Sequence, residues 1–131
     1  MLGELSKDGD NGRIVICDLE GGINTMSRVR PGFLDRVLVV CEPTLKSIET
    51  TDRVLSMADG LGFDSLVLAN RLRRPGDVDM IRRRFPGRAI VEIPEDLGVA
   101  RADRLGVAPI DHAPDSPAVA AIVELARMLV G

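Results

Sequence analysis

Four short apolar segments, spaced along the chain, constrain its fold more than any other feature. They are RIVIC (13–17), RVLVVC (36–41), SLVLAN (65–70) and RAIVEI (88–93). Three of them are near-continuous runs of Val, Leu and Ile, which is typical of strands buried on both faces. Segments with helical spacing lie between them, and the alternation predicts an α/β fold, a parallel sheet with flanking helices and right-handed crossovers.

Two of the intervening segments are predicted to be helices. The first covers 46–60, followed by a glycine stop at Gly60 and Gly62. Its apolar face gathers Ile48, Thr51, Leu55 and Ala58. The second covers 77–84, with Met80 and Ile81 pointing inward.

The last helix has the clearest beginning, because Ser116 fits the N-cap and Pro117 the first helical position. The helical repeat predicts a core-facing stripe formed by Ala118, Ile122, Leu125 and Leu129. At the other end of the chain, residues 1–12 are polar and rich in glycine and aspartate, which predicts a loop or the tail of a helix.

Composition bounds the class of protein. A length of 131 residues predicts a single domain, 1–131, and an apolar content of 45% is enough for a core. Cys17 and Cys41 are far apart within apolar runs, a spacing that suits neither a metal site nor a disulfide framework. The start does not resemble a signal peptide, and no apolar run approaches the ~18 residues of a membrane span. We therefore expect a reduced, cytoplasmic protein that is not an integral membrane protein.

Polar residues follow each of the four predicted strands. Ligands of open parallel sheets bind beyond the carboxyl ends of the strands, so these residues predict a nucleotide site on one rim. In chain order they are Asp18, Glu20, Gly21 and Gly22; Glu42, Pro43 and Thr44; Asn70 and Arg71; and Pro94, Glu95 and Asp96.

Asp18 is the candidate metal ligand of this group. A carboxylate at a strand tip beside a phosphate can hold Mg²⁺ directly or through its waters, and glycines let the backbone approach a phosphate oxygen. Strands of α/β proteins also end in aspartate for turn and capping reasons. The position of Asp18 alone is compatible with both interpretations.

The neighbouring motifs favour the first interpretation. They read CDLEGGINTMSR, VVCEPTLKSIETTDRV, LVLANRLR and IPEDLGVARADRLGVAPID, in this order. Together they resemble the C-terminal half of the MinD/ParA-type P-loop ATPases with a deviant Walker A loop, and most of all the CooC-type accessory ATPases that insert nickel into carbon monoxide dehydrogenase. The resemblance extends from about residue 12 onward. It implies a partial P-loop NTPase (Rossmann-like) fold that lacks the P-loop strand, with ATP or ADP and Mg²⁺ as ligands.

The resemblance also implies roles for individual residues. Asp18 matches the Walker B aspartate, which would hold Mg²⁺ through water. Glu20, Gly21 and Gly22 match the phosphate-sensing switch, with Gly21 in place of the more common alanine. Asn70 matches the asparagine that reads adenine, and Arg71 beside it would lie over the base. The loop that packs against the base is matched by Pro94, Glu95 and Asp96.

The sequence contains no glycine-rich phosphate loop. Its glycine-rich stretches, DGDNG and EGG, are not followed by Lys-Ser/Thr. Phosphoryl transfer depends on positioning and charge stabilisation, so we expect no catalytic residues in this chain alone and no ATP hydrolysis by it. The expected partners are a missing N-terminal half or a homodimer partner. A metalloenzyme client is a further possibility implied by the family.

In the family that the chain resembles, the P-loop strand lies between the Walker B strand and the next one, which here are the first two predicted strands. These two strands could therefore pair directly, receive the missing strand from another chain, or leave a sheet edge exposed. A competing function is a non-enzymatic, degenerate half-domain that binds a partner subunit. A receiver-like domain is a weaker alternative, since it needs a late lysine and the only lysines are Lys7 and Lys46.

Nucleic-acid binding is not expected. Arginines crowd residues 71–88, but Phe85 is the only aromatic side chain among them, so bases have little to stack on. A solvated helix face explains the same arginines.

Overall fold

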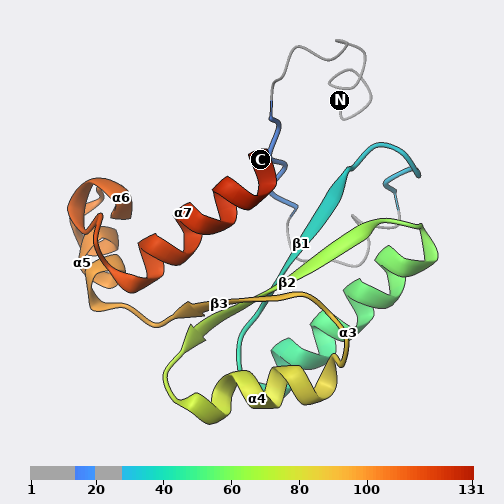
Figure 1. The fold of residues 1–131 in the computed structure, drawn as a ribbon, viewed down its shortest axis with the longest axis horizontal. Helices are drawn as coiled ribbons and strands as arrows, with labels where there is room; N and C mark the ends of the chain where they lie inside the picture. Colours follow the sequence, from blue (N-terminus) through green and yellow to red (C-terminus); the bar gives the residue numbers. More distant parts are fainter. Residues whose placement is uncertain (1–13, 20–27) are drawn as a thin grey trace.

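A computed structural model describes residues 14–19 and 28–131 of the chain (Figure 1). Three parallel strands form one sheet in the order β1-β2-β3. They are β1 (Arg36–Cys41), β2 (Asp64–Leu72) and β3 (Ile90–Pro94). The helices are α3 (Leu45–Gly60), α4 (Pro75–Arg84), α5 (Leu97–Leu105), α6 (Pro109–His112) and α7 (Pro117–Val130). This confirms the predicted α/β class, and the arrangement is consistent with a partial Rossmann-like P-loop fold.

Helix α3 follows its sequence pattern closely. The hydroxyl of Thr44 accepts a hydrogen bond from the backbone N–H of Ser47 at 3.2 Å, which caps the helix. The face predicted to be inward is the buried one, with Ile48, Thr51, Leu55 and Ala58. In α4 the prediction was correct for Ile81 and wrong for Met80: Val78 is buried instead, and Met80 lies on the exposed side.

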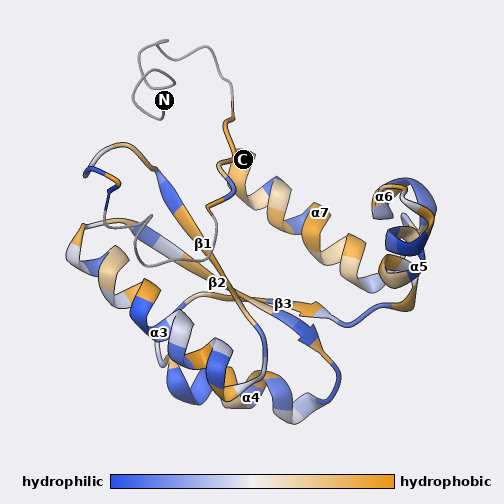
Figure 2. Ribbon diagram, turned by 180° about the vertical axis from the view of Figure 1, so that it is seen from behind, coloured by the Kyte–Doolittle hydropathy of each residue, from blue (hydrophilic) through white to orange (hydrophobic). Residues whose placement is uncertain are grey.

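The sheet separates two cores. Helices α3 and α4 lie on one face and α7 on the other (Figure 1). The first core joins α3 and α4 to the side of β1 that carries Val37, Val39 and Cys41. The second core is smaller and joins Ala118 and Leu125 of α7 to β2 and β3. Figure 2 shows the apolar residues concentrated along the strands and along α7.

The first apolar run does not form the predicted strand. Residues 14–19 have no regular secondary structure, and Ile14, Val15 and Ile16 are exposed, Ile16 to 84%. Direct pairing of this run with β1 was one predicted outcome and is not observed among the described residues, where β1 pairs only with β2. The backbone N–H and C=O groups of a strand form their hydrogen bonds with a neighbouring strand. An apolar run without such a neighbour therefore gains no hydrogen bonds by adopting the strand conformation.

Half of the stripe predicted to face the core on helix α7 is buried. Ala118 and Leu125 are buried, whereas Ile122 and Leu129 are 46% and 36% exposed. The reason is its position, because α7 packs over β2 and β3 and no residue of β1 belongs to this core. None of the described helices is long and apolar enough to span a membrane.

Candidate functional site

The carboxyl ends of the three strands bring polar residues from distant parts of the chain together. Glu42 follows β1, Arg73 follows β2 and Glu95 follows β3. Asn70 and Arg71 were predicted to come after their strand, but β2 continues to Leu72 and includes both. The ladder between β2 and β3 is interrupted at this point, between Ala69 and Leu72.

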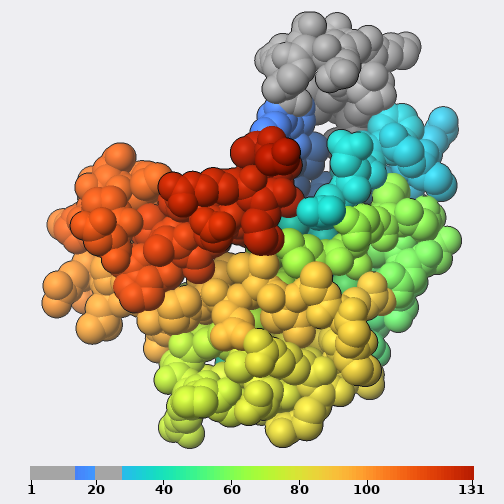
Figure 3. All heavy atoms as spheres, in the orientation of Figure 1, coloured from blue at the N-terminus to red at the C-terminus, as the bar shows by residue number. Residues whose placement is uncertain are grey.

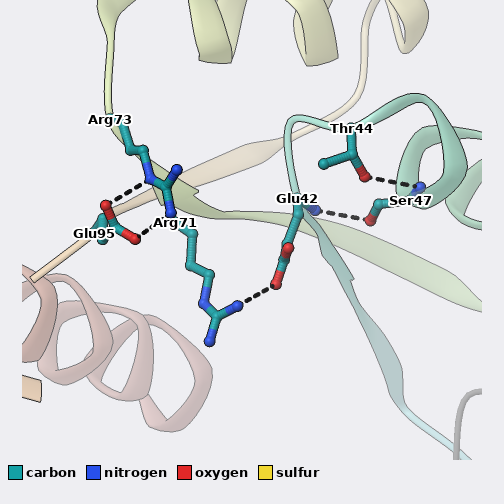
Figure 4. Close-up of polar contacts among 6 residues, drawn as sticks. All are labelled: Glu42, Thr44, Ser47, Arg71, Arg73 and Glu95. Carbon is teal, nitrogen blue, oxygen red and sulfur yellow. Dashed lines mark hydrogen bonds and ion pairs between the residues drawn. The ribbon is translucent and has the colours of Figure 1, made fainter. Parts of the chain in front are cut away.

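Arg71 has an unusual backbone conformation within this interruption. Its φ is 57°, the left-handed region, and it is the one residue other than glycine with positive φ in the described part of the chain. That conformation costs a residue with a side chain about 1–2 kcal/mol. Its guanidinium Nη1 donates to Oε1 of Glu42 at 3.3 Å (Figure 4), so the bend directs the arginine across the end of β1. Strained residues of this kind cluster at functional sites.

Arg73 and Glu95 form a two-pronged ion pair between β2 and β3 (Figure 4). Nε donates to Oε2 at 2.6 Å and Nη2 donates to Oε1 at 2.7 Å. These hydrogen bonds raise the pKa of Arg73 and lower the pKa of Glu95 from their usual values. Both side chains remain exposed, and exposed ion pairs contribute little to stability. An anionic ligand could therefore compete with Glu95 for the guanidinium.

Hydrogen bonds to the backbone fix the loops that carry these charges. The carboxylate of Asp77 accepts from the backbone N–H groups of Arg73 and Arg74 at 2.8 and 3.0 Å, and these bonds lower the pKa of Asp77. Ser47 Oγ accepts from the backbone N–H of Glu42 at 2.9 Å (Figure 4). The turns after β1 and β2 are thus held by the first residues of the helices that follow them.

Asp96 caps two helices at once. Its Oδ1 accepts from the backbone N–H groups of Gly98 at 2.7 Å and Val99 at 3.4 Å, and its Oδ2 accepts from the N–H of Ala118 at 3.3 Å. Burial raises the pKa of this carboxyl, but the hydrogen bonds from Ala118, Gly98, Ser116 and Val99 outweigh it, so the net pKa is lowered. Asp96 therefore joins the start of α5 to the start of α7, whatever ligand the loop binds.

A shallow pocket lies between the ends of β1 and β2. Its volume is about 240 Å³. Its lining consists of Glu42, Pro43, Thr44, Arg71, Arg73, Arg74 and Asp77. Ligand pockets are typically about 300–1,000 Å³, so these residues suit one part of a nucleotide better than a whole one.

A larger hollow of about 360 Å³ lies elsewhere, where α4 leads into β3. Its arginines are already paired. Arg82 bonds Glu92, and Arg88 bonds Asp59 and the hydroxyl of Ser65. It lies away from the carboxyl ends of the strands, and its other lining residues, Phe85, Gly87 and Ile90, offer no polar side chain.

The predicted metal and switch residues belong to a different part of the chain. Asp18 is exposed in the irregular segment 14–19, and no hydrogen bond joins it to the strand ends within the described residues. Glu20, Gly21 and Gly22 lie outside the described residues. Within the described ranges no group of three His, Cys, Asp or Glu side chains could hold a metal ion. A Mg²⁺ role for Asp18 stays a prediction.

Two features of the site were missed in the sequence. Helix α5 follows directly from Asp96 and ends at Leu105, and the next residue, Gly106, forms a left-handed C-cap with a φ of 65°. An aspartate before Leu-Gly-Val-Ala and a glycine ten residues later were the available signals. Arg73 was also not among the predicted site residues, and only its pairing with Glu95 across the sheet makes it stand out.

Comparison with known proteins finds relatives that are named for ATP binding. No protein-family model matches the chain. An uncharacterised ATP-binding protein of Methanocaldococcus jannaschii is 30% identical over all of this chain and 50% of its own length. A second such protein of that organism is 30% identical over 90% of this chain and 46% of its own length. The carbon monoxide dehydrogenase accessory protein CooC of Rhodospirillum rubrum is 30% identical over 76% of this chain and 39% of its own length. The chain spans about half the length of these relatives or less, and the similarities support a P-loop ATPase family.

Proposed function

We propose that the chain is the nucleotide-binding portion of a MinD/ParA-type, CooC-like ATPase, a cytoplasmic accessory factor that helps to mature or position a partner such as a metalloenzyme. The observation that carries the proposal is the polar cluster at the carboxyl ends of the strands, centred on the strained Arg71. The ATP-binding proteins and the CooC protein among the relatives support the same class.

The resemblance to the MinD/ParA-type ATPases supplies a division of roles. Asn70 reads the base, and Arg71 and the loop of Pro94, Glu95 and Asp96 pack against it. The guanidinium groups of Arg71 and Arg73 are held by exposed carboxylates that a negatively charged ligand can replace. Base recognition thus uses β2 and the end of β3, which are neighbours in the sheet and pair again at Leu72 and Pro94 beyond the interruption.

The phosphate end of the nucleotide needs a contribution from outside these 131 residues. Without a glycine-rich loop and its lysines, we expect ATP or ADP to bind at roughly millimolar levels, about −4 kcal/mol. Mg²⁺ and the switch of Asp18, Glu20, Gly21 and Gly22 take effect once the N-terminal half or a partner subunit supplies that loop. The chain alone is expected not to hydrolyse ATP.

Titration of ¹⁵N-labelled protein with ATP, followed by backbone NMR shifts, tests the binding. Shifts should saturate at millimolar ATP and map to the ends of β2 and β3. Asn70→Ala and Arg71→Ala should weaken binding by about fivefold or more. Arg53→Ala, on an exposed turn of α3, is the matched control and should leave it unchanged. Shifts confined to other regions would refute the site.

A phosphate-release assay tests the expected inactivity. Turnover by the wild-type chain that disappears in Asp18→Ala would show that the chain is a complete ATPase. Absence of turnover together with saturable ATP binding is the result that agrees with the proposal.

A second candidate is a non-enzymatic half-domain that binds a partner subunit. The exposed apolar residues of β1 favour it, because no described element covers them. Association with a partner in the absence of any nucleotide-dependent NMR shift would distinguish this function from the first.

A further inference from the structure

The loop of residues 94–96 is tied to the sheet through Glu95. Its backbone N–H donates to the carbonyl oxygen of Leu72, at the end of β2, at 2.9 Å. Its carboxylate holds Arg73 in the two-pronged ion pair. These contacts fix Glu95 relative to β2, and none of them involves the next residue, Asp96.

The carboxylate of Asp96 is occupied by backbone groups. Oδ1 accepts from the N–H groups of Gly98 and Val99 on α5, and Oδ2 accepts from that of Ala118 on α7. An ordinary helix cap explains the two bonds to α5 but not the bond to Ala118, which is 22 residues away along the chain. A carboxylate accepts about four hydrogen bonds, so Asp96 has little left to offer a nucleotide base.

Helix α7 gives this loop a fixed support. Ala118 is 5% exposed and belongs, with Leu125, to the core that α7 forms with β2 and β3. In Figure 3 the orange atoms of α5 and α6 gather around the start of α7. Asp96 therefore connects the loop to a helix that is itself packed on the same sheet.

Gly98 allows α5 to approach this junction closely. A Cβ at Gly98 would lie 2.8 Å from the Cβ of Ala113, in the turn between α6 and α7, and 2.9 Å from Oδ1 of Asp96. Both distances are shorter than the separation at which such atoms attract each other. The φ of Gly98 is not positive, so the close contact requires glycine here and the backbone conformation does not. Glycine is otherwise less favourable than alanine within a helix.

We propose that Asp96 and Gly98 are positioning residues for the nucleotide, which clamp the loop of residues 94–96 to the start of α7 without touching the ligand themselves. This inference rests on the proposed function, because it takes the loop as the surface that packs against the base. It gives Asp96 a supporting role and leaves the contact with the base to Pro94 and Glu95. Binding groups must be held within about 0.5 Å of their working position, so loosening the clamp weakens binding.

Two substitutions loosen the clamp in different ways. In Asp96→Asn the side-chain amide keeps an oxygen that can cap α5, but its NH₂ group cannot accept from Ala118. In Gly98→Ala a methyl group enters the junction, although alanine favours the helix itself. The matched controls are Asp103→Asn, at an exposed carboxylate of α5, and Gly60→Ala, at the end of α3, where a Cβ meets nothing within 4 Å.

ATP affinity is measured by NMR titration, and amide hydrogen exchange at Glu95 reports the position of the loop, with circular dichroism to check folding. Asp96→Asn and Gly98→Ala should each weaken ATP binding by about fivefold or more and speed exchange at Glu95. The controls should change neither. Adding Ala113→Gly to Gly98→Ala removes the nearest obstacle and should restore affinity, because the two positions are in contact.

Wild-type affinity in both clamp variants would overturn the proposal. A loss in Asp96→Asn alone would also overturn it, because the carboxylate would then contact the ligand directly, and so would a loss in Gly98→Ala alone. If the wild-type chain binds no ATP, the proposed function fails and the exchange at Glu95 decides on the clamp. Faster exchange in both clamp variants, and not in the controls, would support the clamp, and unchanged exchange would refute it.

Discussion

Arg71 is a position where we expect glycine to stabilise the protein relative to alanine, the opposite of the usual order. Its φ of 57° lies in the left-handed region, which glycine adopts freely and residues with a Cβ do not. Replacement by alanine removes the guanidinium but keeps the strained backbone. Replacement by glycine removes the guanidinium and also relieves the strain of the backbone.

The expected difference follows from two opposing terms. Relief of the left-handed conformation favours glycine by about 1–2 kcal/mol. The greater freedom of glycine in the unfolded chain favours alanine by about 0.4–1 kcal/mol. The ion pair to Glu42 is lost in both variants and cancels. Arg71→Gly should therefore be more stable than Arg71→Ala by roughly 0.5–1 kcal/mol.

Urea unfolding followed by circular dichroism measures this difference. With a slope near 2 kcal/mol/M, the midpoint of Arg71→Gly should lie about 0.3–0.5 M above that of Arg71→Ala. Arg73, two residues along, is the matched control because its φ is not positive, so Arg73→Gly should be less stable than Arg73→Ala. If Arg71→Gly is the less stable of its pair, the backbone of Arg71 is not strained and the argument fails. Both Arg71 variants should bind ATP more weakly than the wild type, which would show that the strain is retained for the guanidinium.

The remaining predictions concern the core, a helix cap and pH. The side chain of Ile81 has no exposed surface. In urea titrations, Ile81→Ala should lower the free energy of unfolding by about 2–5 kcal/mol, and Ile81→Val should lower it by about 0.5–1.5 kcal/mol. Equal losses in the two variants would exclude a cavity as the cause. Thr44→Ala should cost about 1 kcal/mol and Thr44→Ser much less, because the hydroxyl caps α3; a similar cost for both would exclude capping. The hydrogen bond from Arg88 lowers the pKa of Asp59 from 3.8, and the pKa of Asp96 is also lowered from 3.8. The stability that these two carboxylates contribute is therefore present above pH 3.8. It is lost as the pH falls through their pKa values in the folded protein. The urea midpoint should therefore be level down to about pH 5 and fall below about pH 4, less steeply in Asp59→Asn, and a midpoint that rises on acidification would contradict the assignment.

Local sequence patterns predicted the elements whose structure depends on neighbouring residues. The inward face of α3 repeats with the helical period and Ser116 provides a hydroxyl cap for α7, so both helices could be placed from a few neighbouring residues. The strands β1, β2 and β3 were recognisable as apolar runs, although β2 begins one residue earlier and ends two residues later than predicted. A run such as 13–17 has the same composition, but whether it pairs depends on a neighbour that composition does not specify.

The candidate site was predictable in position and not in detail. Because parallel strands present their carboxyl ends at one edge, Glu42, Arg71 and Glu95 could be expected to gather there. Their actual pairings join residues 29 and 22 positions apart and depend on the register of three strands. The roles predicted for Asn70 and Pro94 in base recognition stay predictions.

The sequence by itself determined the class of fold, the edge of the sheet where polar groups converge, and the absence of a phosphate loop within these residues. These follow from residue order alone, through the periods of strands and helices and the polarity of parallel sheets. Only the tertiary structure decided that Arg71 adopts a left-handed backbone within β2, that Asp96 joins α5 to α7, and that Leu38 and Val40 of β1 are exposed. Each of these depends on contacts between distant segments, because the conformation and exposure of a residue are set by what packs against it.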